Sequence, residues 1–183
     1  MTSFEPCADT MREFRDALGQ FGTGVTVVTA QCPEGPVGMT ANSFASVSLD
    51  PPLVLWSPAL ASLRYAHFEA ASHYAIHVLR DDQAGLARRF ARDAHAFEGL
   101  DWHKGEHDLP LIEGCLARFE CRQEAAHEGG DHMILVGRVL RACIGAGAPL
   151  LFAQGRYGGF APADATRATQ GTTPAAKAAP STD

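Results

Sequence analysis

Small polar side chains that could hold a ligand are concentrated in residues 37–58, which read VGMTANSFASVSLDPPLVLWSP. Hydroxyl and amide groups occur there at Thr40, Asn42 and Ser43, and Ala41 between them is small. This composition would let a flat polar heterocycle approach main-chain N–H and C=O groups, as in pockets that combine apolar walls with a few convergent polar groups. A strand with one solvated face has the same pattern, so the segment alone predicts either a ligand site or a wet strand face.

A second candidate for chemistry is the sequence Gly129-Gly130-Asp131-His132. Gly-Gly-Asp is typical of a turn, and His132 is the first residue of a strongly apolar strand. The imidazole is therefore expected at the rim of a β-structure, where it can hydrogen-bond a ligand while Asp131 orients its tautomer. The alternative is a turn aspartate that caps its own backbone beside an exposed histidine.

Other motifs fail in their sequence context. His103 and His107 have the spacing of the HxxEH zinc peptidases, which requires a helix, but Gly105 and Pro110 favour a loop. We therefore predict no metal site. The glycines of residues 22–24 lead from a helix into a strand, the reverse of a dinucleotide-binding fingerprint, and no P-loop sequence occurs. The five cysteines form no CxxC pair and are interpreted as reduced thiols.

Two β-rich runs flank the polar segment: GVTVVTA at residues 24–30 and LVLW at residues 53–56. A helix between them is not expected, because Ser, Thr and Asn side chains compete with helical backbone hydrogen bonds. The sequence Asp50-Pro51-Pro52 predicts an extended corner, since each proline removes a donor and disfavours the α region before it. The polar segment is thus expected to lie along the edge of a sheet.

Short helices are expected at the ends and between strands, one of them with Ser62 as its N-cap. The expected helices are 11–21, 62–70 and one that is capped by Asp81 or Asp82 and ends at Arg92, and the further strands are 74–79, 116–122, 132–143 and 149–152. A loop-rich stretch from 93 to 114 could cover a site as a lid. About six strands with many turn residues predict a mainly β fold, a closed or nearly closed antiparallel barrel.

The composition indicates one ordinary globular domain. Of the 183 residues, 46% are apolar and 20% charged, and the formal charge of −6 disfavours nucleic acid and anionic membranes as partners. We expect a flexible N-terminus at 1–10, the domain at 11–160 and a disordered tail, rich in Ala, Thr and Pro, at 161–183. We recognise neither a signal peptide nor an apolar stretch of membrane-spanning length. We therefore expect a cytoplasmic protein.

The ordered set of motifs resembles the short-chain flavin reductases, the reductase components of two-component flavin monooxygenases. The resemblance covers about residues 11–160. It rests on the segments FGTGVTVVTA, GMTANSFASVSLDPPLVLWSP, YAIHVLRDDQAGLARRFA, LARFEC, GGDHMILVGRV and PLLFAQGRYGGF, which occur in this order. The resemblance implies an FMN-binding split β-barrel, antiparallel and Greek-key-like, with short flanking helices.

The resemblance also implies roles for individual residues. Those expected around the flavin ring are Thr40, Ala41, Asn42 and Ser43. Ser57 and Ser62 would lie toward the flavin phosphate, and Phe90 and Phe97 would close over the flavin or the nicotinamide. His132 would position the nicotinamide, and Tyr157 would approach the same pocket.

The implied activity is hydride transfer from NADH or NADPH to FMN, with FAD as another possible flavin. A homodimer would pass reduced flavin to a partner monooxygenase. Two alternatives stay open: a split-barrel reductase with a retained flavin that acts on another acceptor such as a corrinoid, and a flavin- or haem-binding module without catalysis.

Overall fold

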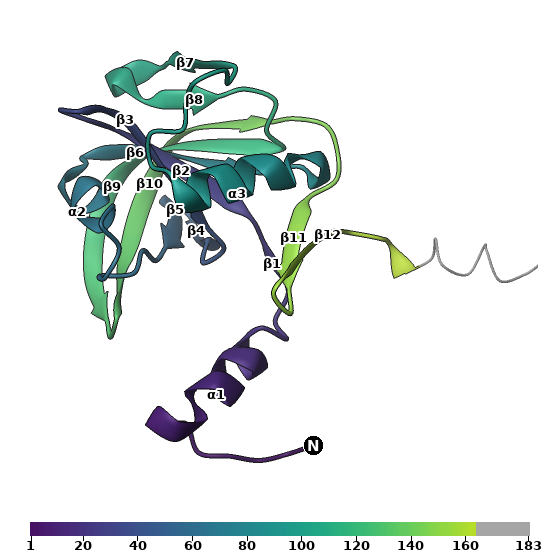
Figure 1. The fold of residues 1–183 in the computed structure, drawn as a ribbon. Helices are drawn as coiled ribbons and strands as arrows, with labels where there is room; N and C mark the ends of the chain where they lie inside the picture. The colour runs from purple at the N-terminus through teal and green to yellow at the C-terminus, as the bar shows by residue number, and fades with distance from the viewer. Residues whose placement is uncertain (164–183) are drawn as a thin grey trace, which may run out of the picture.

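The computed structural model describes residues 1–163 as an open antiparallel β-barrel with short helices around it (Figure 1). Residues 164–183, most of the tail predicted to be disordered, lie outside the described residues. The flexibility predicted for residues 1–10 stays a prediction. None of the helices in the described part is long and apolar enough to cross a membrane.

Seven strands form the main sheet, in the order β3-β2-β6-β9-β10-β5-β4, and every neighbouring pair is antiparallel. Their bounds are Thr26–Cys32 for β2, Gly35–Ala41 for β3, Ala45–Leu49 for β4, Pro52–Trp56 for β5, His73–Val78 for β6, Ala117–Gly129 for β9 and His132–Ile144 for β10. The outer strands β3 and β4 do not pair with each other in this sheet, so the barrel is split. This confirms the predicted mainly β split barrel.

Two smaller sheets complete the β-structure. One joins β1 (Thr23–Gly24), β11 (Leu150–Ala153) and β12 (Arg156–Gly159), and the other is the hairpin of β7 (Trp102–Lys104) and β8 (Pro110–Ile112). The α-helices are α1 (Met11–Leu18), α2 (Tyr65–Ala70) and α3 (Ala84–Arg92), with 3₁₀ turns at Ala8–Thr10, Asp81–Gln83 and Glu106–Asp108. The predicted strands and helices are all present, although several differ in their ends.

The hairpin of β9 and β10 is longer than the sequence indicates, because β9 continues beyond the predicted end at Arg122. Residues 123–129 are mostly exposed and lack apolar alternation, but they pair with β10 along their length. Glu124 lies between two guanidinium groups, 2.9 Å from Arg138 and 3.0 Å from Arg122, and they lower its pKa to about 2. Cross-strand pairing thus maintains a strand that hydrophobic periodicity does not reveal.

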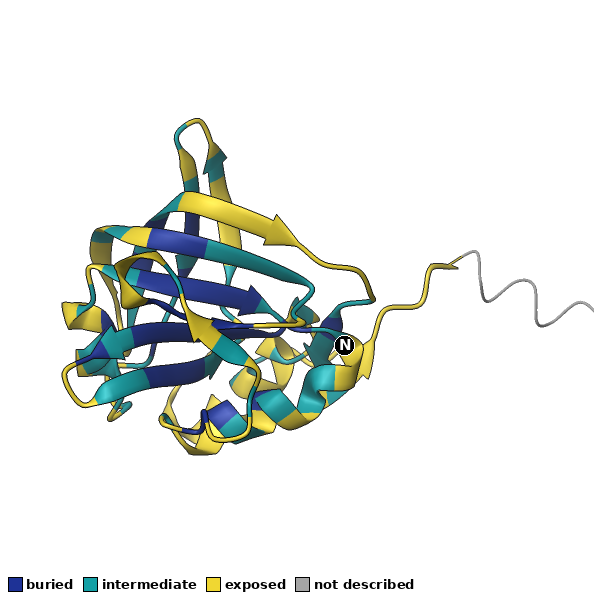
Figure 2. Cartoon of the chain, turned by 90° about the horizontal axis from the view of Figure 1, so that it is seen from above, coloured by how far each residue is buried: buried dark blue, intermediate teal, exposed yellow. Residues whose placement is uncertain are grey.

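The inner faces of the strands enclose the main core (Figure 2). Trp56 is fully buried, and its ring meets those of Phe68 at 5.0 Å and Tyr74 at 6.0 Å, both nearly edge to face. Such pairs stabilise a core beyond the area they bury. Trp56 therefore fills the barrel.

The hairpin of β7 and β8 closes one side of the barrel through a buried histidine. His77 accepts a hydrogen bond at Nε2 from the N–H of Ile112, 3.0 Å away, and its Nδ1 lies 3.0 Å from the carbonyl oxygen of Val27. Burial lowers the pKa of His77 to about 3, so the ring is neutral and donates from Nδ1 to that carbonyl. The stretch predicted as a possible lid over a site instead includes this hairpin, which lies on the barrel.

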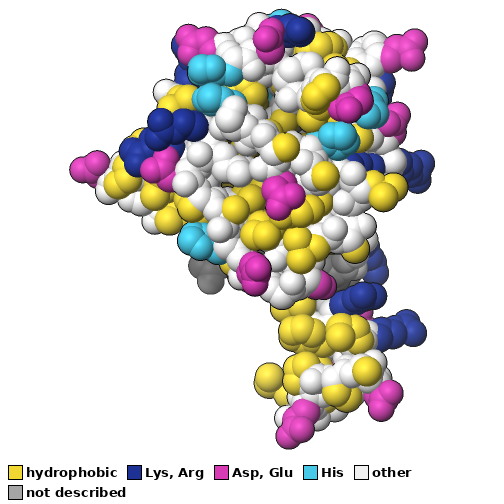
Figure 3. All heavy atoms as spheres, turned by 90° about the vertical axis from the view of Figure 1, so that its left-hand side faces the viewer, with side chains coloured by type: hydrophobic (Ala, Val, Ile, Leu, Met, Phe, Trp, Pro, Cys, Tyr) yellow, Lys and Arg dark blue, Asp and Glu magenta, His cyan; other side chains and the backbone are white. Residues whose placement is uncertain are grey.

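Helix α1 stands clear of the barrel and is joined to it through β1 (Figure 1). None of its residues is buried, and Met11 and Leu18 are exposed, as is Phe21 just beyond it. Figure 3 shows hydrophobic side chains gathered over this protruding part. The helix was predicted to reach residue 21 but ends at Leu18. Beyond it, the Gly19 carbonyl oxygen and the Gln20 side-chain oxygen accept hydrogen bonds from Gln154, in the turn between β11 and β12.

Candidate functional site

A small open hollow lies where the end of β3 meets the sheet of β1, β11 and β12. Its volume is about 120 Å³, and it is lined by Val25, Thr40, Ala41, Asn42, Phe152 and Tyr157. Four of these residues were predicted to hold a cofactor, and they come from two segments that are more than a hundred residues apart in the sequence. The fold brings them together because β11 lies between β1 and β12 in the three-stranded sheet.

The polar side chains of this hollow make hydrogen bonds to other groups of the protein. The hydroxyl of Thr40 donates to the carbonyl oxygen of Ala87 at 2.7 Å, and the Asn42 amide donates to the Thr23 hydroxyl at 3.3 Å. Within residues 1–163, the main-chain N–H groups of Asn42 and Ser43 make no hydrogen bond. The groups left free for a ligand are therefore those of the main chain, as expected for the polar edge of a heterocycle.

Ser43 connects this hollow to the next loop. Its Oγ accepts a hydrogen bond from the N–H of Ser57 at 2.8 Å and donates to the Ser57 carbonyl oxygen at 3.2 Å. Ser57 follows β5, so one hydroxyl fixes the end of that strand against the segment after β3. Both serines were predicted site residues, and the structure places them in contact.

The loop after Ser57 is in turn attached to the turn that carries His132. Met133 donates to the Pro58 carbonyl oxygen at 3.0 Å, and Leu60 donates to that of Asp131 at 2.9 Å. His132 Nδ1 lies 2.7 Å from Asp131 Oδ1, and this contact lowers the pKa of the Asp131 carboxyl. The Asp131 carboxylate therefore holds one ring nitrogen and leaves Nε2 for a ligand.

Ser62 is not the helix N-cap that the sequence predicts, whereas its predicted place toward the flavin phosphate stays a prediction. Helix α2 begins at Tyr65 with Arg64 as its N-cap, so Ser62 is not the cap; its Oγ accepts a hydrogen bond from the Arg64 N–H at 3.3 Å. The reason is that residues 59–64 form tight turns before the helix starts. The Arg64 side chain then donates to the Phe90 carbonyl at 2.7 Å and the Ala91 carbonyl at 3.2 Å, at the end of α3.

Phe90, on the buried side of α3, and Phe97 lie in the core in this structure, so the position predicted for them over a ligand is not seen in the single chain. Phe90 is fully buried and Phe97 is 5% exposed, and their rings meet at 5.0 Å. Phe90 is held there by a close approach of α3 to β3, since a Cβ on Gly38 would lie 2.5 Å from its ring. In this conformation the two rings support α3 instead of forming a ligand wall.

Sequence reasoning missed three contributors to the site. Val25 and Phe152 line the hollow, but each looks like an ordinary core residue of a strand. Arg64 falls within the helix predicted at 62–70 and was given no role, whereas in the structure it is the N-cap of α2. A cation at such a position can cap the carbonyl groups of another helix, but only the tertiary structure shows which helix.

Two cysteines and two histidines outside this site are not arranged as a second catalytic centre. Burial raises the pKa of Cys115 to about 11 and that of Cys121 to about 12, which disfavours their thiolate forms. His103 lies in β7 and pairs with Glu113, whereas the ring of His107 stacks on His73. No group of three or more potential metal ligands occurs among these residues.

Comparison with known proteins gives the family. The flavin reductase-like domain matches residues 18–161. The chain is 59% identical over 157 residues to the FMN reductase (NADH) SmoA of Agrobacterium fabrum, covering 86% of this chain and 90% of that protein. This chain belongs to the flavin reductase-like domain family.

Other members of the flavin reductase-like family agree in sequence and in fold. The monooxygenase reductase subunit HsaB of Rhodococcus jostii is 41% identical over 153 residues, covering 82% of this chain and 78% of its own. The solved NADH:FAD oxidoreductase SgcE6 of Streptomyces globisporus superposes with a TM-score of 0.80 at 40% identity, over 88% of this chain and 99% of its own. The resemblance seen in the sequence motifs is thus confirmed.

Proposed function

We propose that this protein is an NADH-dependent flavin reductase that reduces FMN or FAD and delivers the reduced flavin to a partner monooxygenase. The observation that carries the proposal is the continuous line of contacts from the hollow at Thr40 and Tyr157, through Ser43 and Ser57, to His132. Relatives named as NADH-dependent flavin reductases and as monooxygenase reductase subunits support it. Those names give no support to corrinoid reduction or to a non-catalytic module.

The residues present fit a flavin. Within residues 1–163 the N–H groups of Asn42 and Ser43 make no hydrogen bond, and Asn42 lines the hollow together with Phe152 and Tyr157; polar main-chain groups beside aromatic rings suit a flat ring with one polar edge. The serine-bearing loop at 57–62 is set at one end of this line, where the hydroxyl groups of Ser57 and Ser62 can donate to a phosphate. Thr40 and Ser43 keep these elements in place through their hydrogen bonds.

The bound cofactors supply the reaction, a hydride transferred from the nicotinamide to the flavin. The chain contributes position: His132, oriented by Asp131, offers Nε2 to the nicotinamide carboxamide. No general base is required of the protein, because a proton from solvent completes the reduced flavin. The ring of Tyr157, fixed against Phe152 at 5.3 Å, limits where the ring system can lie.

We propose a homodimer because one chain supplies only part of the site. The hollow of about 120 Å³ is smaller than the roughly 300 Å³ at which ligand pockets begin. The apolar side of α1 is unpartnered in the single chain, as are Val47 and Leu49 on the edge strand β4. A second copy that covers these surfaces would also complete the wall of the hollow.

We further propose that residues 11–160 form the working domain and that the protein acts in the cytoplasm. The five cysteines support this location, since all are free thiols and none is paired. A cytoplasmic reductase would also have direct access to NADH.

The test is anaerobic oxidation of NADH and NADPH by the purified protein, with FMN, FAD and riboflavin added in turn. We expect turnover of added flavin with NADH, and transfer of the reduced flavin to a flavin-dependent monooxygenase. A protein that binds flavin but oxidises neither nicotinamide would overturn the proposed activity. A flavin that is reduced but never released would overturn its delivery to a partner.

A further inference from the structure

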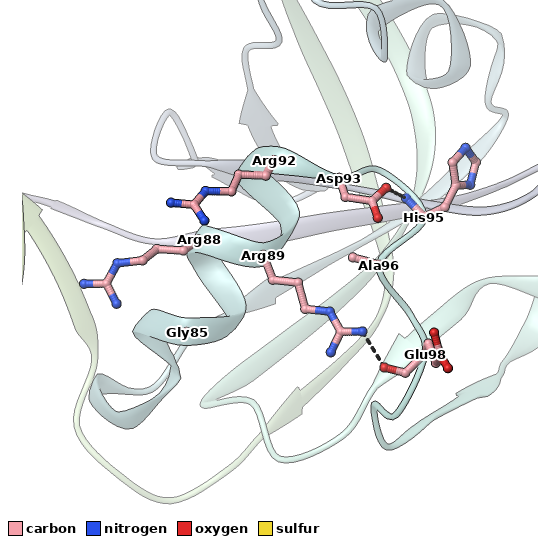
Figure 4. A pocket seen from close by; sticks show the side chains of 8 residues that line it. All are labelled: Gly85, Arg88, Arg89, Arg92, Asp93, His95, Ala96 and Glu98. Carbon is pink, nitrogen blue, oxygen red and sulfur yellow. Dashed lines mark hydrogen bonds between the residues drawn. The ribbon is translucent and has the colours of Figure 1, made fainter.

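Three arginines of α3 form a cationic face that the flavin site leaves unexplained. Arg88, Arg89 and Arg92 share one side of the helix with Gly85, at spacings of three and four residues. They line an open hollow of about 460 Å³ whose other wall is the segment 93–98 (Figure 4). This volume lies within the range of small-molecule sites, roughly 300–1,000 Å³.

The cationic charge of this face is not neutralised by the chain. None of the three arginines lies within 4.0 Å of a carboxylate among residues 1–163, whereas Arg80, Arg118 and Arg138 all do. Arg88 and Arg92 are exposed and stand on adjacent turns, an unfavourable spacing for like charges. A bound anion would offset this repulsion.

Arg89 and Arg92 also lie in the last helical turn, where cations are favoured by the helix dipole, but Arg88 does not. In Figure 4 the side chains of Arg88 and Arg92 extend to the same side, and Arg89 reaches the Glu98 carbonyl oxygen, which accepts its hydrogen bond. Arg89 therefore fixes the far wall, and the other two guanidinium groups remain available.

Arg88 connects this face with the proposed flavin and nicotinamide site. Its guanidinium carbon lies 5.2 Å from the centre of the Tyr157 ring, and Tyr157 lines the hollow with Thr40 and Asn42. Arg88 therefore lies next to a residue that lines the hollow. The arginines are thus placed for a phosphate that is attached to the reacting ring.

We propose that Arg88 and Arg92 bind the pyrophosphate of an adenine dinucleotide whose reacting ring is either the flavin in the hollow at Tyr157 or the nicotinamide placed against that flavin. Guanidinium groups bind phosphate oxygens in pairs, and two of them on adjacent turns match two linked phosphates. The carboxylates of Asp93 and Glu98 at the far wall would repel a ligand that carries many negative charges. A dinucleotide, with two phosphates, therefore suits the hollow better than a polyanion. This inference rests on the proposed function. NADH and FAD share the required chemistry.

The test compares the double variant Arg88→Gln/Arg92→Gln with a control, Lys104→Gln/Arg122→Gln, which removes the same charge elsewhere. Calorimetry with ADP-ribose, which carries the pyrophosphate but no reacting ring, measures the site without catalysis. We expect its Kd to rise roughly tenfold or more in the double variant, given the strength of hydrogen bonds between charged groups, and to be unchanged in the control.

Kinetics and flavin binding then identify the dinucleotide. If NADH is the ligand, its KM rises while that of reduced nicotinamide mononucleotide does not. If FAD is the ligand, its Kd rises while that of FMN does not. Unchanged ADP-ribose, NADH and FAD binding in the double variant would overturn the proposal, as would equal losses for dinucleotides and mononucleotides. Wild-type protein that oxidises no NADH but binds ADP-ribose through these arginines would disprove only the proposed function.

Discussion

The side chain of Ser43 is bonded to the main chain of Ser57 at two points, as acceptor from its N–H at 2.8 Å and as donor to its carbonyl oxygen at 3.2 Å. This relationship joins the segment expected to hold the flavin ring to the loop expected to hold its phosphate. The two halves of the proposed site are thus coupled through one hydroxyl group.

Replacing Ser43 with alanine should therefore weaken flavin binding more than it destabilises the fold. Loss of these hydrogen bonds costs about 0.5–1.5 kcal/mol each in unfolding free energy, and the freed loop at 57–62 should raise the Kd for FMN several-fold. Flavin fluorescence and urea denaturation measure the two effects. Ser46→Ala, at an exposed serine of β4, is the matched control. FMN binding equal to that of the control would contradict the coupling.

His132→Ala should raise the KM for NADH and leave the Kd for FMN nearly unchanged. The reason is that Nε2 is the ring nitrogen left for the nicotinamide, while the flavin contacts come from other segments. Asp131→Asn should produce a smaller change in the same direction, because an amide orients the ring less strongly than a carboxylate. Steady-state kinetics at varied NADH separate these cases, and wild-type KM in both variants would refute the role.

His77 should make the protein less stable in acid. Its pKa is about 3 in the folded protein and about 6.5 when unfolded, so the unfolded chain binds one more proton between these values. The stabilisation is complete above pH 6.5 and is lost as the pH falls toward 3, by about 1.4 kcal/mol per pH unit. In urea denaturation from pH 7 to 4, His77→Gln should remove that part of the slope. An unaltered slope would show that the histidine is not buried in its neutral form.

Gly38→Ala should destabilise the protein through Phe90. The new Cβ would lie 2.5 Å from the Phe90 ring, and overpacking of this kind costs about 1–3 kcal/mol. Gly85 lies in α3, and a Cβ added there would have no atom within 4 Å, so Gly85→Ala should be neutral or stabilising. Thermal unfolding of the two variants provides the comparison. Equal stability would mean that α3 does not approach β3 this closely.

Charged substitutions at the end of α1 and just beyond it should separate the proposed dimer. Leu18→Glu combined with Phe21→Glu places charge on apolar surface that is 59% and 78% exposed in the single chain. We expect a smaller mass in light scattering and weaker flavin binding, because the second wall of the hollow would be lost. Glu13→Gln, on the same helix, should leave the mass unchanged. A monomeric wild-type protein would rule out the dimer.

The sequence alone predicted most strands of the barrel, the fold class and the family. The runs at residues 24–30 and 53–56 have local β patterns, and the polar side chains between them exclude a helix because they compete for its hydrogen bonds. The turn before His132 is equally local, since glycine permits the turn and the apolar run beyond it requires a strand. Motif order then identified the family without any contact information.

Only the tertiary structure decided which of these residues meet and which are buried. Phe90 seemed a ligand contact, but the absence of a side chain at Gly38 lets α3 approach β3 and bury it. Ser62 seemed a helix cap, but the turns before Tyr65 delay the helix. Arg88 lies close to the candidate site only because β12 places the ring of Tyr157 beside it. Local patterns follow from backbone and solvation energies, whereas these contacts depend on pairing between strands far apart in the chain.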